Sequence, residues 1–299
     1  MKQSKRIMLL ACLLASLLGA HLALAEPQKP LPDIRQLMAE VQAHQKQLEK
    51  VRENYTYSSL QTTQDLDSNG KVTKTQSVEG EDFFVNGHVI ERMVKKNGQP
   101  LSGHDLNKET ERVTKLVEKA ENTPPGQPLE RQTISISRIL EIMDVRNARR
   151  VQLHGRPTIV FDFIGRKDAK THGMLEDASK KLQGTIWIDE ADRQVAHMEV
   201  SFNDNFHVAG GLLANIQKGS SFRFDQAPVN HPNDKDTSSG AAVSDALWLP
   251  TGAEASVQAR VLLVKNMRQH FVERDYGYKR FNVETQQSKE AQVVTEKAQ

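Results

Sequence analysis

Three Asn-Gly dipeptides constrain the fold of this chain more than any other feature of its sequence. They stand at residues 69–70, 86–87 and 97–98. The runs around them have strand character and cover residues 55–65, 71–85 and 88–95. Asn-Gly suits the two-residue type I′ turn, which joins neighbouring antiparallel strands. The sequence therefore predicts a β-meander in this part of the chain.

Strand-like runs return in the second half of the chain, again with short connections. They cover residues 150–153, 158–164, 184–189, 194–202, 220–225, 253–265 and 271–283. Short connections favour antiparallel neighbours, so these runs extend the same sheet. Residues 227–245 are rich in Asn, Asp, Ser, Pro and Gly and predict a long mobile loop.

The strongest helical pattern begins at Asp33, which stands three residues before Gln36 in a capping-box arrangement. Apolar residues then recur every three or four positions, at Ile34, Leu37, Val41, Leu48, Val51 and Tyr55. The pattern predicts one amphipathic helix of about six turns. Such a helix needs an apolar surface to lie on, and an ordinary core provides one as well as a cavity does. Two shorter helical segments are expected at 102–120 and 135–145.

The first 25 residues carry the three parts of a secretory signal. Lys2, Lys5 and Arg6 give a positive start, residues 7–20 are apolar, and Ala23-Leu24-Ala25 offers a small-x-small cleavage site. We expect cleavage near Ala25 and a periplasmic or secreted location.

Two alternatives exist for this segment. Residues 7–25 are almost long enough to be retained as a membrane anchor, although residues 19–21 interrupt the apolar run. Cys12 follows a sequence that resembles a lipidation box, but residues 7–11 are too short for the apolar region of such a signal.

Removal of this segment changes the composition of the chain. Cys12 is the single cysteine, so the mature chain has no disulfide, thiol nucleophile or thiolate metal site. Taking the segment's three basic residues from the 40 in the chain leaves 37 against 38 acidic residues. A balance near zero gives no general attraction to nucleic acid or to an anionic membrane surface.

The sequence from Asp65 to Gln76 resembles a calcium-binding loop. Asp65, Asp67, Asn69 and Gly70 match the D-x-D-x-N-G spacing. Gln76 stands where the loop needs a bidentate Glu, and the flanks have strand character where an EF-hand needs helices. A solvated hairpin tip is the favoured interpretation, and no metal or cofactor is expected.

Catalytic motifs are missing from the sequence. The histidines show no zinc-ligand spacing, and there is no G-x-S-x-G, Walker or G-x-G-x-x-G motif. Asp162, Asp189 and Asp192 lie in or beside strands, but their separation in sequence predicts no carboxylate pair. We expect a protein that is not an enzyme, with a hydrolase assembled from distant residues as the alternative.

A large sheet with few helices suggests an apolar concavity that is only partly filled. The mid-chain helices near 102–145 would cover it as a lid, whereas the alternative is a closed α+β core. Periodicity alone nominates the following cavity residues, each of which is equally a candidate for permanent core: Leu37, Val41, Leu48, Leu116, Ile136, Leu140 and Met143.

The order of these elements resembles the LolA/LolB-like superfamily of periplasmic lipoprotein-sorting carriers. The segments that carry the resemblance are 66–70, 97–101, 155–157 with 161–163, 184–189, 248–250 and 278–281. The resemblance spans nearly the whole mature chain and implies an open, incomplete β-barrel that holds acyl chains beneath a helical lid. The chain departs from typical carriers in its greater length, and it lacks the lipidated cysteine of the receptor form.

The sequence thus predicts an α+β fold, a mainly antiparallel open half-barrel with a long N-terminal helix and mid-chain lid helices. Residues 26–283 would form a single domain, followed by a disordered polar tail at 284–299. The expected function is binding of lipid or lipoprotein acyl chains by a monomer that makes at most transient membrane contact, with no role for nucleic acid. The alternative is an envelope sensor or interaction domain that binds a peptide or protein.

Overall fold

The computed structural model describes residues 29–127, 129, 135–229, 247–262 and 264–280. Asp33 begins the compact unit that holds the whole sheet. The predicted signal segment and the tail at 284–299 lie outside the described residues.

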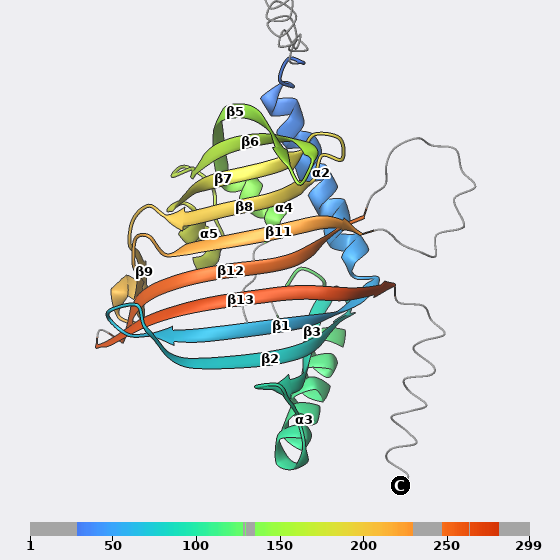
Figure 1. The fold of residues 1–299 in the computed structure, drawn as a ribbon, viewed down its shortest axis with the longest axis vertical. Coiled ribbons are helices and arrows are strands. Elements are labelled where there is room, and N and C mark those ends of the chain that lie inside the picture. Colours follow the sequence, from blue (N-terminus) through green and yellow to red (C-terminus); the bar gives the residue numbers. More distant parts are fainter. Residues whose placement is uncertain (1–28, 128, 130–134, 230–246, 263, 281–299) are drawn as a thin grey trace, which may run out of the picture. The chain divides into compact units, whose positions relative to one another are not determined.

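The unit is built on one antiparallel sheet of 13 strands (Figure 1). The strands of its first half are β1 (Tyr55–Leu66), β2 (Val72–Val85), β3 (His88–Lys96), β4 (Gln99–Pro100), β5 (Met143–Leu153) and β6 (Arg156–Gly165). Those of its second half are β7 (Leu182–Asp189), β8 (Val195–Phe202), β9 (Phe206–Val208), β10 (Ala214–Ile216), β11 (Ser221–Val229), β12 (Leu247–Val261) and β13 (Lys265–Arg280).

The strand order leaves the sheet open. It runs β4-β3-β2-β1-β13-β12-β11-β8-β7-β6-β5, and short β10 pairs with β12 and β9 beside this path. The last long strand, β13, lies between β1 and β12, so the first and last strands pair in the middle of the sheet. β4 and β5 are the two edges, which confirms the predicted open, mainly antiparallel half-barrel.

Two of the three Asn-Gly dipeptides form the predicted turns. Asn86 and Gly87 have φ of 50° and 77°, and Asn97 and Gly98 have φ of 52° and 75°. The third turn, between β1 and β2, is wider. The Asp67 carboxylate there accepts hydrogen bonds from the backbone N–H of Asn69 at 2.8 Å and of Lys71 at 2.9 Å. Asp67 therefore stabilises a hairpin tip, as predicted.

The long helix α2 (Ile34–Arg52) begins as predicted. Asp33 Oδ1 accepts from the backbone N–H of Gln36 at 2.9 Å, and the face with Leu37, Val41 and Leu48 is buried. Tyr55, which fits the helical spacing, belongs instead to β1. The other helical elements are α3 (Gly103–Glu121), α4 (Ile136–Ile142), α5 (Met174–Ser179) and the 3₁₀ turn η1 (Ala209–Gly211).

Two predicted boundaries are wrong. The helix predicted at 135–145 ends at Ile142, because Met143 starts β5 and pairs with Gly165 of β6. The pairing of β5 with β6 thus extends the strand predicted at 150–153 to begin at Met143. The apolar spacing of the added residues also fits a helix. Residues 227–229 of the predicted loop belong to β11, where Ala227 pairs with Leu249. The rest of that loop to 245 lies outside the described residues.

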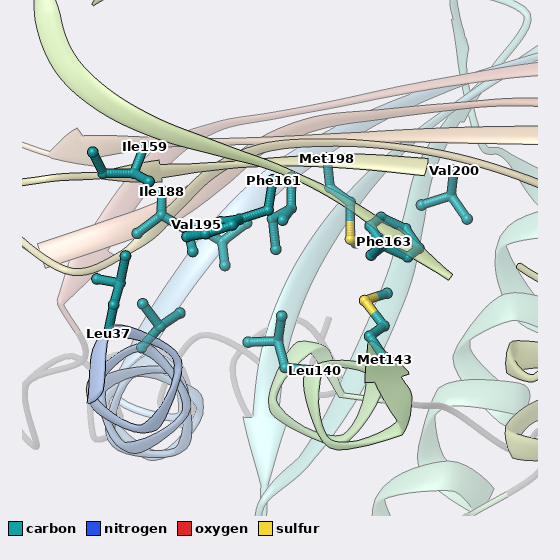
Figure 2. Close-up of a cluster of buried hydrophobic side chains, with 12 residues drawn as sticks. Leu37, Leu140, Met143, Ile159, Phe161, Phe163, Ile188, Val195, Met198 and Val200 are labelled. Carbon is teal, nitrogen blue, oxygen red and sulfur yellow. The ribbon is translucent and has the colours of Figure 1, made fainter. Parts of the chain in front are cut away.

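The main core lies between α2, α4 and strands β6 to β8 (Figure 2). Leu37 and Leu140 project from the helices towards Ile159, Phe161 and the strand residues beside them. Gly184 of β7 permits this packing, since a Cβ there would lie 2.8 Å from Phe163 Cζ and 1.9 Å from the backbone oxygen of Glu199. We call the face that this core covers the inner face of the sheet.

Helix α3 packs elsewhere. Leu116 and Ala120 contact Ile90 of β3 and Phe83 of β2 in a separate apolar cluster. Phe83 and Ile90 are paired neighbours and alternate with Asp82 and Glu91, so the two pairs occupy opposite faces of β2 and β3. The two mid-chain helices therefore cover different parts of the sheet.

A buried polar network fixes the C-terminal half of α2. Leu48 packs against Trp248 and Ala196. Trp248 Nε1 donates to Asp192 Oδ2 at 2.9 Å, and Arg156 binds Asp192 at 2.7 Å and Asp189 at 2.5 Å. Asp189 and Asp192 are thus structural carboxylates at the turn between β7 and β8.

Candidate functional site

The inner face changes from apolar to polar along one row of paired residues. Directly paired residues of antiparallel strands share a face. The row that starts in the core crosses seven strands in the order Phe161, Ile186, Met198, Phe224, Ala253, Glu273 and Gln61. Its first three residues are buried in the core, and its last two are polar.

The middle of this face carries half-buried apolar side chains, which we call the inner strip. Its members are Phe222, Phe224, Ala253, Ala255, Val257 and Phe271. Phe222 is the most exposed member, with an exposed fraction of 39%. In Figure 1, α4 lies across β7 and β8, and α3 lies beside β2 and β3. The strip therefore lies beside the area that α4 covers, whereas α3 packs on the opposite face of β2 and β3.

Four carboxylates, the acidic cluster, lie where the strip ends. They are Asp82 of β2, Glu91 of β3, and Glu273 and Asp275 of β13. Pairing places Asp82 opposite Glu91, and Glu273 next to Ala253 of the strip.

Two further polar residues join this part of the face. Gln61 Nε2 donates to Glu91 Oε1 at 3.4 Å, and Ser59 pairs with Asp275 across β1 and β13. The cluster thus spans four adjacent strands.

Several polar atoms of this region are buried without a hydrogen-bond partner among the described residues. They are Asp82 Oδ2, Ser59 Oγ, Asp275 Oδ1 and Arg52 Nε, the last from the end of α2. Asp82 is 6% exposed and Ser59 is 1% exposed. Buried polar groups in native proteins nearly always have partners, so this concentration of unpaired groups calls for an explanation.

Burial raises the pKa of three of these carboxyls. Burial raises the pKa of Asp82 to about 7; it outweighs the nearby Ser59 hydroxyl, which acts to lower this pKa, and the charge of Glu91 adds to the rise. The pKa of Glu273 rises to about 7 through burial and the neighbouring charge of Asp275. The pKa of Asp275 rises to about 6 through burial and the charge of Asp82. Arg52 opposes all three shifts but does not cancel them.

Gly80 of β2 and two tyrosines pack closely against the cluster. Gly80 pairs with Ser59, and a Cβ on Gly80 would lie 2.9 Å from Ser59 Oγ and 3.1 Å from Glu91 Cγ. Tyr57 and Tyr278 stack at 4.9 Å beside it, and Tyr278 donates to the backbone oxygen of Pro250 at 2.8 Å. Burial raises the pKa of both phenols, so they stay neutral.

The cluster does not have the form of a metal centre. Among the residues that the structure describes, no three His, Cys, Asp or Glu side chains converge closely enough to hold a metal ion. Carboxylate and hydroxyl oxygens accept hydrogen bonds from N–H donors, including those of an ammonium group.

The other end of β12 carries an exposed apolar group, which we call the apolar tip. Leu212 and Leu213 follow η1, and Leu262 and Val264 flank the turn from β12 to β13. Their exposed fractions are 65%, 54%, 62% and 84%. The N–H of Leu262 donates to the backbone oxygen of Leu213 at 3.0 Å, so the two loops are adjacent.

The surroundings of the apolar tip are basic. Residues 206–219 and 255–268 contain no Asp or Glu. Lys218, Arg260 and Lys265 are exposed there. The tip is therefore an apolar projection with a positive rim.

A histidine on the opposite, outer face also has charged partners. His197 Nδ1 lies 2.6 Å from Asp225 Oδ1, and His197 Nε2 lies 3.3 Å from Glu199. Burial acts to lower the pKa of His197, but these two carboxylates outweigh it and raise the pKa. Arg223 and Glu254 continue this surface as a ladder of ion pairs.

The structure divides the seven nominated cavity residues among three clusters. Leu37, Val41, Ile136, Leu140 and Met143 meet in the main core. Leu48 packs against Trp248, and Leu116 lies on α3 at the other face of β2 and β3. Their role as ligand contacts stays a prediction.

Sequence reasoning missed the inner strip and the acidic cluster. The alternation of apolar and polar residues along 253–257 could have indicated the inner strip. The acidic cluster, in contrast, gathers carboxylates that are about 190 residues apart in sequence. No short-range spacing in the sequence predicts such a cluster.

Comparisons with known proteins leave the family open. No family model matches the chain, and no curated protein matches it by sequence. Among solved structures, it is similar to a DUF1329 family protein from Desulfovibrio piger, at 10% identity and a TM-score of 0.34, over 84% of this chain and 95% of that chain. It is also similar to MucB, solved in complex with MucA(peri), at 10% identity and a TM-score of 0.21, over 81% of this chain and 99% of that chain. Because both TM-scores are low, we infer function from the residues of this chain.

A search of the described helices for membrane spans found none of sufficient length and apolar character.

Proposed function

We propose that this protein is a periplasmic or secreted binding protein that holds the acyl chain of a lipid or lipoprotein on the inner face of its open sheet. The observation that carries the proposal is the inner strip. Half-buried Phe, Ala and Val side chains occupy the middle of a sheet whose helices α3 and α4 cover other parts. Apolar surface of this kind usually marks a ligand or partner site.

The strip suits a narrow chain. Ala253 and Ala255 form a shallow floor between Phe224 and Phe222 on one side and Phe271 on the other. Transfer of an acyl chain from water to such a surface contributes about 0.8 kcal/mol per buried methylene. A chain of ordinary length thus gains enough free energy to offset the cost of ordering it.

The apolar tip supplies a plausible route to a membrane. The inward-facing residues of β12 continue from Ala253 through Val257 to Val261, next to Leu262 of the tip. Exposed aliphatic side chains with a basic rim favour contact with an anionic lipid surface. Contact at the tip would bring one end of the strip to the lipid, which agrees with the carrier role implied by the LolA/LolB-like resemblance.

The proposal is tested with protein purified from its native envelope. Native mass spectrometry should show co-purified lipid, and an apolar fluorescent probe should bind the delipidated protein and be displaced by a fatty acid. No lipid together with no probe binding would exclude the carrier function. Binding of a peptide in place of lipid would favour the sensor or interaction domain, and turnover in a metal-free esterase or glycosidase screen would favour a hydrolase.

A further inference from the structure

We propose that the acidic cluster binds the primary ammonium head of an amphiphile whose chain lies along the inner strip. This inference rests on the proposed function, because it takes the strip as the site of the chain. It adds the chemical class of the ligand, a single-chain or lipid amine.

The unpaired buried groups point to a ligand. Ser59 is 1% exposed and Asp82 is 6% exposed, yet Ser59 Oγ and Asp82 Oδ2 have no hydrogen-bond partner among the described residues. Asp275 Oδ1, on the strand next to Ser59, is also buried without a hydrogen-bond partner among the described residues. These three acceptors lie on the adjacent strands β1, β2 and β13, and an ammonium group carries three N–H donors to offer them.

The charges around the cluster favour a cation. Asp82, Glu91, Glu273 and Asp275 supply four carboxyls, and Arg52 supplies one guanidinium from the end of α2. The remaining titratable neighbours are Tyr57 and Tyr278, whose buried phenols stay neutral. A bound cation would add positive charge to that of Arg52.

The cluster and the strip are continuous, which determines the orientation of the ligand. Glu273 pairs with Ala253, and Phe271, two residues before Glu273, pairs with Ala255. An ammonium group at the carboxylates therefore places its chain over Ala253 and Ala255, directed towards the apolar tip.

Proton linkage gives the site a pH dependence. A bound ammonium favours ionised carboxylates, so binding releases the protons that burial retains on Asp82, Glu273 and Asp275 in the free protein. Affinity for the amine should therefore rise with pH from about 5.5 to about 8.

The experiment compares three probes with the same twelve-carbon chain, each below its micelle concentration: dodecylammonium, dodecanoate and dodecyl maltoside. Isothermal titration calorimetry on the delipidated protein should give an affinity for dodecylammonium about tenfold or more above that for dodecanoate at about pH 8. Calorimetry in buffers of different ionisation enthalpy should detect proton release for the amine alone.

Two variants and one control locate the effect. Asp82→Asn and Asp275→Asn should each reduce the preference for the amine while keeping affinity for dodecyl maltoside. Glu254→Gln removes the same charge from the outer face and should leave the preference unchanged.

The outcomes separate the two proposals. Equal affinity for all three heads, or equal loss of preference in Glu254→Gln, overturns the ammonium site and leaves the chain-binding function in place. No binding of any probe overturns the proposed function and this inference with it.

Discussion

Ser59 of β1 and Asp275 of β13 are paired neighbours on the inner face, yet Ser59 Oγ and Asp275 Oδ1 are both buried without a hydrogen-bond partner among the described residues. Unpaired buried polar atoms cost stability. A fold that keeps several of them in one place is organised for something other than maximal stability, which agrees with a binding role for this part of the sheet.

The acidic cluster should make the free protein less stable as pH rises. Asp82 and Glu273 have pKa values of about 7 in the fold, above their ordinary values. Their contribution to stability is therefore complete below about pH 4 and is lost as pH rises through about 7. Asp82→Asn should be more stable than the parent protein at about pH 8, on the order of 2 kcal/mol, with little difference below about pH 4. Thermal unfolding across this range measures both.

The comparison of Asp82→Asn with its parent cancels the titrating groups that lie away from the acidic cluster. His197, whose pKa is also raised, loses its stabilising contribution in the same direction in both proteins. The outer-face variant Glu254→Gln should not reproduce the gain at high pH. If Asp82→Asn lost stability as steeply as its parent when pH rises, ionisation of Asp82 would not be the cause of the loss.

Filling the inner strip should block chain binding without unfolding the protein. Ala255→Trp places a large ring among Phe222, Phe271 and the rest of the strip. We expect affinity for a twelve-carbon chain to fall about tenfold or more, because the ring occupies the apolar surface that several methylenes would cover. Ser256→Trp is the matched control, since Ser256 is exposed and points to the outer face. Equal affinity in the two variants would place the chain elsewhere.

The apolar tip should control membrane association. Leu212→Asp combined with Val264→Asp adds two negative charges to side chains that are 65% and 84% exposed. Flotation with vesicles that contain phosphatidylglycerol should show about a tenfold loss of binding, through lost apolar contact and charge repulsion. Leu106→Asp on α3, where the leucine is 48% exposed, is the control and should bind like the parent protein. Unchanged flotation of the double variant would remove the tip from the membrane contact.

Trp248 should contribute to stability through its indole nitrogen. Trp248→Phe removes the donor to Asp192 Oδ2 and leaves that buried carboxylate with fewer partners. A loss of about 1–3 kcal/mol is expected, which is a fall of about 2–12 °C in Tm for a chain of this size. The control Trp187→Phe changes a ring that lies edge-on to His197 at 4.6 Å on the outer face, and it should cost less. Differential scanning calorimetry distinguishes the two, and equal losses would argue against the hydrogen bond.

Local sequence signals predicted most of the elements. Asp33 caps α2, and Asn-Gly at 86–87 and 97–98 fixes two turns, because capping and positive φ depend on neighbouring residues alone. The errors arose where pairing overrode periodicity. Met143 fits the helical spacing of 135–145, but its hydrogen bonds belong to the β5–β6 ladder.

The candidate site was less accessible to sequence reasoning. Leu37 and Leu140 were nominated from a helical stripe, and a stripe shows that a residue is buried without showing what covers it. Leu116 has the same pattern as Leu37, yet it lies on another face of the sheet. The acidic cluster depends on β13 returning between β1 and β12, a long-range pairing that no local pattern encodes.

Local signals were enough to predict the antiparallel meander and the amphipathic α2, because turn chemistry and helical periodicity depend on a few neighbouring residues. The near-neutral charge balance expected after signal cleavage follows from composition alone. The placement of four carboxylates on one face with the inner strip depends instead on the three-dimensional fold; they are Asp82, Glu91, Glu273 and Asp275. That arrangement follows from strand order and register, in which a shift of one residue would turn every one of these side chains to the opposite face.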